Sequence, residues 1–289
     1  MSLGRFGIWS SALQVKGSSA DGEVLAATQE LEKLGYGAVW IGGSSSVRHA
    51  AALIAATDSL TVATGILSIW DEEAADVAAQ TAELAAAHPG RFLLGLGASH
   101  ALLAGDRYQR PYSAMVAYLD ALDAAPVPVP AEARVLAALG PKMLRLSGER
   151  TAGAHPYLVT VEHTAEARAA LGPGPLLAPE VKVVLDADPE RARSTGRDYL
   201  ARYLQLPNYT GNLLRLGFSE QDFADGGSDR LVDALFAWGD ADAVRARAEE
   251  FLAAGADHLA LQLVTGGDQP GLPRDGWRRL AELLELGRP

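Results

Sequence analysis

The chain has 289 residues, 48% of them hydrophobic and 21% charged, which is the composition of a globular protein with ample residues for a core. Its net charge of −11 argues against a nucleic-acid surface and against binding to anionic membranes. It has no cysteine, no stretch long and apolar enough for a membrane span, and no export signal at its start, so we expect a cytoplasmic protein without disulfides.

Short apolar segments alternate with helical ones along the chain. The pattern predicts strands over 4–10, 38–41, 60–69, 91–97, 135–139, 156–160, 181–185 and 258–264. It predicts helices over 21–34, 47–57, 71–87 (with Asp71 as the N-cap), 113–124, 142–150, 164–171, 240–254 and 277–286. Residues 189–238 show helical periodicity with no clear strand, whereas 98–111 are irregular.

Strands that are apolar on both faces and separated by helices are typical of a parallel sheet. Eight such units predict an α/β fold, a (β/α)8 TIM barrel, as a single domain over residues 1–289 with a helical insertion at about 189–238 after strand seven. The alternative is a doubly wound sheet, which should carry a glycine fingerprint after its first strand. Residues 95–100, GLGASH, resemble that fingerprint only weakly because His100 replaces the third glycine.

In a barrel, functional side chains gather at the C-terminal ends of the strands. That rule selects Trp9, Ser10, Trp40, Gly42, Gly43, Gly65, Ile66, Ser68, Trp70, Gly97, Ser99, His100, Leu139, Gly140, Lys142, Thr160, Glu162, Gln262 and Thr265. Glycines let backbone approach a ring and tryptophans pack beside one, so this set suits a flat aromatic ligand. The alternative is that the glycines form ordinary turns and the tryptophans close the barrel.

Individual residues leave two readings open. Gly140 and Pro141 begin a helix whose free N–H groups suit an anion, with Lys142 beside it, but Lys142 could equally be a solvated position. His100 could exchange a proton near neutral pH or bond to backbone. The six histidines show no metal-ligand spacing, so we expect no metal site.

Three long stretches carry a family resemblance: residues 138–160 (ALGPKMLRLSGERTAGAHPYLVT), 200–218 (LARYLQLPNYTGNLLRLGF) and 237–264 (AWGDADAVRARAEEFLAAGADHLALQLV). Through them the chain resembles the luciferase-like monooxygenase superfamily, in its branch of oxidoreductases that use the deazaflavin coenzyme F420. The resemblance covers nearly the whole chain. It implies a (β/α)8 barrel whose insertion covers the pocket.

The resemblance also implies a cofactor site. The ring would lie over strands three and four, near Trp40, Gly42, Gly97 and Ser99, with a non-prolyl cis peptide at Gly65–Ile66 behind it. The phosphate would meet Gly140 and Lys142, and Gly153, Ala154 and His155 occupy the place of a small-residue motif near the cofactor tail. That last placement conflicts with a strand at 156–160, which puts Gly153 at the far rim, unless strand six begins nearer 150–152.

The function implied is hydride transfer between coenzyme F420 and an unknown small organic substrate, with His100 handling the proton because strand two ends in Gly42-Gly43-Ser44, without an acidic residue or histidine. One alternative is an FMN-dependent monooxygenase of the same fold. Another is a barrel that binds a ligand without turnover. Relatives often dimerise, so the resemblance allows a homodimer.

Overall fold

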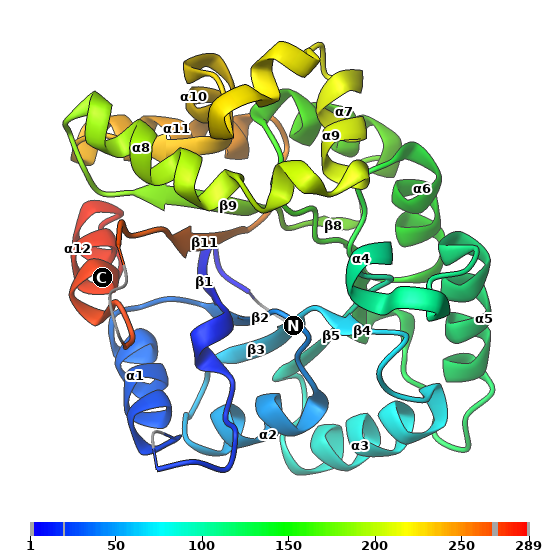
Figure 1. Ribbon diagram of the computed structural model, residues 1–289. Coiled ribbons are helices and arrows are strands. Elements are labelled where there is room, and N and C mark those ends of the chain that lie inside the picture. Colours follow the sequence, from blue (N-terminus) through cyan, green and yellow to red (C-terminus); the bar gives the residue numbers. More distant parts are fainter. Residues whose placement is uncertain (1–2, 20, 268–270, 288–289) are drawn as a thin grey trace.

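A parallel sheet curls through the centre of the computed structural model, which describes residues 3–19, 21–267 and 271–287 (Figure 1). Its strands are β1 (Phe6–Ser10), β2 (Ala38–Gly42), β3 (Thr61–Gly65), β4 (Leu67–Ser68), β5 (Phe92–Gly97), β6 (Arg134–Leu136), β7 (Gly153–Ala154), β8 (Leu176–Leu177), β9 (Glu180–Val184), β10 (Phe236–Trp238) and β11 (Leu259–Leu263). The pairing path runs β10-β9-β11-β1-β2-β3-β5-β6-β7-β8, with β4 beside β5.

Helices surround the sheet (Figure 1). They are α1 (Asp21–Lys33), α2 (Val47–Ala55), α3 (Ala74–Ala87), α4 (Ala101–Ala104), α5 (Pro111–Asp123), α6 (Pro141–Arg150), α7 (Val161–Leu171), α8 (Pro189–Leu200), α9 (Pro207–Arg215), α10 (Asp229–Leu235), α11 (Ala241–Ala253) and α12 (Arg274–Leu283). Short 3₁₀ helices lie at Ser11–Leu13, Gly105–Arg107, Ala131–Ala133, Tyr203–Gln205 and Glu220–Gly226.

The curled sheet comes round on itself where β8 leads into β9. The amides of Ala178 and Glu180 donate to the carbonyls of Ala154 and Pro156, on the β7 side. The amide of Ala260 donates to the carbonyl of Pro179, on the β11 side. The predicted α/β class and TIM-barrel architecture are therefore confirmed. Pairing is regular from β9 through β11 and β1 to β6, and sparse along the short strands β7 and β8, so the regular part of the sheet is a half-barrel.

Two apolar layers hold the barrel together. An outer layer packs the sheet against the helices, with residues such as Ile8, Val39 and Leu94 fully enclosed. An inner layer fills the barrel and includes Trp9 and Trp40 among smaller side chains. Each central strand contributes to both layers, which is why these strands are apolar on both faces.

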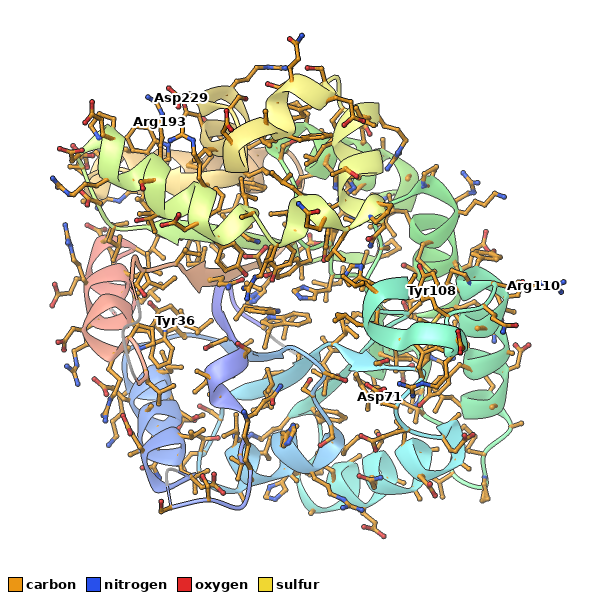
Figure 2. All side chains as sticks on the ribbon, viewed as in Figure 1. Tyr36, Asp71, Tyr108, Arg110, Arg193 and Asp229 are labelled. Carbon is orange, nitrogen blue, oxygen red and sulfur yellow. The ribbon has the colours of Figure 1, made fainter. Side chains whose placement is uncertain are left out.

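The insertion has a core of its own. Within residues 189–238, the helices α8, α9 and α10 pack around Leu200, Leu213 and Val232. Arg193 of α8 pairs with Asp229 at 3.1 Å and with Asp233 at 2.7 Å, and these contacts tie α8 to α10 (Figure 2). The helical character predicted for this segment is confirmed, although it ends in a strand, β10, that was not predicted.

The predicted strand at 156–160 is wrong, and the strand lies earlier, at Gly153–Ala154. Gly153 pairs closely with β8, since a Cβ on it would lie 1.9 Å from the carbonyl oxygen of Leu176. Pro156 has no N–H for a ladder, and Leu158 has a φ of 56°, so the following segment cannot continue as a strand.

Asp71 is not the N-cap of the third helix. That helix, α3, begins at Ala74, and Glu73 precedes it without a side-chain cap. Asp71 instead accepts a 2.5 Å hydrogen bond from the Ser44 hydroxyl and lies 3.3 Å from the Arg107 guanidinium, at the edge of the barrel mouth where Figure 2 labels it. It therefore links the β2–α2 loop to the segment that follows α4.

Candidate functional site

Three tyrosine hydroxyls meet at the C-terminal end of the barrel. Tyr157 follows β7, whereas Tyr199 and Tyr203 come from the insertion, at α8 and just after it. The Tyr157 hydroxyl oxygen lies 2.5 Å from that of Tyr199 and 2.9 Å from that of Tyr203, and the last two are 3.0 Å apart. Gln262 of β11 completes the cluster, because its Oε1 accepts from Tyr157 at 3.0 Å and its Nε2 donates to Tyr199 at 2.7 Å.

A buried ion pair lies beneath this tyrosine cluster. Lys182 Nζ and Glu180 Oε2, both on β9, are 2.6 Å apart, and their side chains are 1% and 0% exposed. The Lys182 ammonium also lies 4.0 Å from the centre of the Tyr157 ring, a cation–π distance. Burial raises the pKa of Glu180 and lowers the pKa of Lys182. The opposite charge of the partner acts against both shifts and so favours the ionised pair.

A cavity of about 260 Å³ opens beside the cluster, between the ends of β1 and β11 and the start of α12. Its wall includes Trp9, Tyr199, Arg202, Gln262 and Trp277. A second depression, of about 510 Å³, shares Tyr199 and Arg202 with the first cavity and has Asp198 in its wall. The rim rule selected Trp9, Ser10, Gln262 and Thr265, and all four line the first cavity.

Trp9 occupies the space above two of the predicted ring-binding glycines. Its Nε1 donates to the Gly65 carbonyl at 3.0 Å, and a Cβ on Gly42 would lie 2.5 Å from the indole. The peptide bond between Gly65 and Ile66 is cis, at the position that the resemblance implies. Gly97 faces the Ile66 side chain, so Gly42, Gly65, Ile66 and Gly97 are brought together at one rim.

Trp40 and His155 lie deeper, inside the barrel. Their rings stack with centroids 4.1 Å apart, and their side chains are almost wholly enclosed. His155 Nδ1 is 2.7 Å from the Ala178 carbonyl, and Trp40 Nε1 donates to His258 Nε2 at 3.0 Å. Burial lowers the pKa of His155 and of His258 to about 4, so both rings are neutral at physiological pH. With these partners, Trp40 and His155 are part of the barrel core.

Gly153 and Ala154 are also enclosed, because they form β7 between β6 and β8. Ser99 has a φ of 55° just after β5 and is half-buried. Gly140 precedes α6 with open space around it, and no side chain caps that helix. Lys142 is exposed in the first turn.

Arg215 was not among the predicted residues. It belongs to α9, and its guanidinium lies 3.3 Å from the Leu139 carbonyl, next to the start of α6. The insertion therefore brings a second cation toward the uncapped helix N-terminus, where the first N–H groups are free to meet an anion. Sequence position could not reveal this, because Arg215 and Leu139 are 76 residues apart.

His100 lies at the barrel mouth against the insertion. Its Nδ1 is 2.8 Å from Asn208 Oδ1 and its ring is 5.0 Å from that of Tyr209. Because Asn208 Oδ1 can only accept, Nδ1 carries the proton and Nε2 is the basic nitrogen of the neutral ring. Burial lowers the pKa of His100, which favours that neutral form. His100 lines neither cavity described above.

The part of the chain that the structure describes has no group of three or more potential metal ligands, and it has no helix able to span a membrane.

One family model matches the first part of the barrel. Residues 4–126 match the family model of the luciferase-like monooxygenases, which covers β1 to α5. No curated protein matches the sequence. The expected resemblance to the luciferase-like superfamily is thus confirmed over residues 4–126.

Solved structures extend the likeness to the whole chain. An F420-dependent secondary alcohol dehydrogenase in complex with an F420-acetone adduct has a TM-score of 0.73, with 15% identity over 99% of both chains. The coenzyme F420 dependent tetrahydromethanopterin reductase from Methanopyrus kandleri has a TM-score of 0.73 and 17% identity, over 97% of this chain and 96% of its own. The oxygenating constituent of 3,6-diketocamphane monooxygenase from Pseudomonas putida, in complex with FMN, has a TM-score of 0.65 and 15% identity, over 97% and 96%. At these identities the structures establish the fold.

Proposed function

We propose that the protein is an oxidoreductase that transfers a hydride between coenzyme F420 and a small organic molecule at the C-terminal end of the barrel. The observation that carries the proposal is the cavity beside Trp9 and Ser10, which opens at the C-terminal ends of β1, within the segment matched by the luciferase-like family, and of β11, outside it. Functional sites of (β/α)8 barrels lie at that end. The bound deazaflavin would supply the hydride chemistry, and the protein would bind and orient both molecules.

The residues at this rim fit such a cofactor in two places. Gly65, Ile66, Gly97 and Ser99 offer backbone and a small apolar surface for a flat ring, with Trp9 beside them. Gly140, Lys142 and Arg215 offer an uncapped helix start and two cations for a phosphate-bearing tail. Five of the predicted cofactor-binding residues pack against other parts of the chain behind these surfaces, and we propose that they support the rim and do not contact the cofactor. They are Trp40, Gly42, Gly153, Ala154 and His155.

We propose His100 for proton transfer from its place at the barrel mouth, although it lines neither of the two cavities. Its basic Nε2 can accept a proton from an alcohol when hydride leaves the substrate carbon, and can return that proton when a carbonyl is reduced. Asn208 fixes the tautomer through Nδ1. The insertion around α8 and α9 would exclude water from the reacting atoms.

A cofactor titration tests the proposal. Purified protein is titrated with F420 and, separately, with FMN, and cofactor fluorescence and absorbance are followed. We expect saturable F420 binding that weakens about tenfold or more in Arg215→Gln, since a charge-assisted contact to phosphate is lost. Arg145→Gln, an exposed position on α6, is the matched control and should bind F420 as the parent does.

Tight binding of FMN alone would replace the proposal with an FMN-dependent monooxygenase, the alternative that the FMN complex of similar fold favours. Binding of neither cofactor would instead favour a barrel that holds a ligand without turnover.

A further inference from the structure

The cavity between β1, β11 and α12 has an unusual charge for this protein. The chain carries a net charge of −11, yet among the residues that the structure describes the cavity wall includes one arginine, Arg202, and no aspartate or glutamate. The remaining wall is apolar or bears hydroxyl and amide groups, with Trp9, Leu272 and Trp277 supplying much of the apolar surface. A pocket with a single cation and no anion complements a small organic anion.

Arg202 differs from the arginines of the preceding helix. Arg191, Arg193 and Arg197 of α8 each pair with an aspartate. Arg202 makes no ion pair that we observe in the described part of the chain. Its guanidinium instead stacks 4.7 Å from the Tyr199 ring centre and 4.9 Å from that of Tyr203. Its Nη2 also donates a long hydrogen bond, of 3.4 Å, to the Tyr203 hydroxyl. Stacking on aromatic faces and this contact orient the guanidinium, and its other N–H groups remain to meet a ligand.

The rings beneath Arg202 are themselves fixed. Tyr199 and Tyr203 share hydrogen bonds with Tyr157, and Gln262 donates to Tyr199. On the opposite side Lys182 lies 5.3 Å from the centre of the Tyr199 ring, so a second cation, itself paired with Glu180, faces the cluster from below. The Tyr199 hydroxyl therefore has a set position at the cavity wall, next to Arg202.

We propose that this cavity binds the carboxylate of a small organic acid, which pairs with Arg202, while its apolar part packs against Trp9, Leu272 and Trp277. Calling this acid the substrate rests on the proposed function, whereas its binding does not. The volume of about 260 Å³ restricts the ligand to a compact molecule. Arg202 makes the cavity selective for an anion over a neutral molecule. The tyrosine cluster holds the Arg202 guanidinium in position.

Binding can be measured without any cofactor. The probe is benzoate, an aromatic carboxylate, and benzyl alcohol is its uncharged counterpart. Each is added to the purified protein while tryptophan fluorescence is followed, because Trp9 and Trp277 line the cavity. We expect saturable benzoate binding, and we expect benzyl alcohol to bind at least about tenfold more weakly, as a charge-assisted contact would be absent.

Variants identify the cation responsible. Arg202→Gln should weaken benzoate binding about tenfold or more and leave benzyl alcohol unchanged, whereas Arg202→Lys should keep part of the affinity. Arg191→Gln removes the same charge from α8 outside the cavity and is the matched control, with benzoate affinity unchanged. Circular dichroism spectra that coincide with that of the parent show that each variant is folded.

Three results would overturn the inference: no saturable benzoate binding, equal affinity for benzoate and benzyl alcohol, or an equal loss in Arg191→Gln and Arg202→Gln. The F420 titration is run on the same preparations. A protein that binds F420 but not benzoate loses only this inference, and one that binds benzoate but neither F420 nor FMN loses only the proposed function.

Discussion

The buried pair of Lys182 and Glu180 allows a quantitative test of how the barrel interior is built. Replacing Lys182 with methionine keeps most of the side-chain volume and removes the charge. Glu180 would then be left fully enclosed, with one oxygen accepting from the Leu158 amide at 3.2 Å and the other, Oε1, without a partner. Removing one member of a buried pair costs about 3–5 kcal/mol because the remaining charge is uncompensated. We therefore expect Lys182→Met to lower the free energy of unfolding at pH 7.5 by about that amount.

The double variant Lys182→Met/Glu180→Gln removes both charges and separates this penalty from lost packing. A neutral amide has a far smaller desolvation cost than a carboxylate, so the double variant should recover more than half of the stability lost by Lys182→Met. The pH dependence gives a second check. Without Lys182, burial leaves the folded-state pKa of Glu180 above its ordinary value of 4.5. The cost of Lys182→Met should thus grow as pH rises above about 4.5 and shrink as pH falls toward it.

Urea unfolding followed by tryptophan fluorescence, at several pH values, measures all three proteins. A loss below about 1 kcal/mol in Lys182→Met would refute the reasoning, since that is the range of an exposed ion pair. So would a double variant that is less stable than Lys182→Met, because the penalty would then come from packing and not from an unpaired carboxylate.

Two further predictions concern the histidines and β7. Burial lowers the pKa of His155 and His258 from 6.5 to about 4, so both stay neutral while the unfolded chain takes up protons. Stability should be level above about pH 6.5 and fall by up to about 3 kcal/mol per histidine toward pH 4. His155→Gln should reduce this slope, as urea titrations would show. Gly153→Ala should lower the free energy of unfolding by at least about 2 kcal/mol in the same assay, since a Cβ would lie 1.9 Å from the Leu176 carbonyl oxygen. Gly174→Ala is the control, because its Cβ would meet nothing within 4 Å. Equal stability of the two variants would contradict this prediction.

The barrel could be predicted because its central strands carry the signal themselves. Residues such as Val39 and Trp40 face opposite layers and are both fully buried, so a parallel strand appears in the sequence as an unbroken apolar run. The short strands β7 and β8 lack that signal. Two residues each are too few to show any period, and the apolar run at 157–159 lies in the loop after β7. The boundary error there came from apolar residues that pack without forming a strand.

The site could be predicted only in part. Strand ends identify Trp9, Ser10, Gln262 and Thr265 at the cavity because the barrel places them all at one rim. Tyr199, Arg202 and Tyr203 could not be identified in the same way. They lie in a helical segment whose periodicity predicts helices but does not say which face will cover the barrel. Their role depends on contacts with Tyr157 and Gln262, from distant parts of the chain.

Trp9 and Trp40 show why a residue's place on a strand does not settle its role. They are register partners in β1 and β2, and both side chains belong to the inner layer of the barrel. Yet the Trp9 indole donates to Gly65 at the C-terminal end of β3, whereas the Trp40 indole donates to His258, just before β11 begins. Glycines determine the difference: Gly42 and Gly65 leave room for Trp9 at the mouth, and Gly7 leaves room for His258 below. A tryptophan thus faces the cavity or fills the core according to where its strand neighbours lack a side chain.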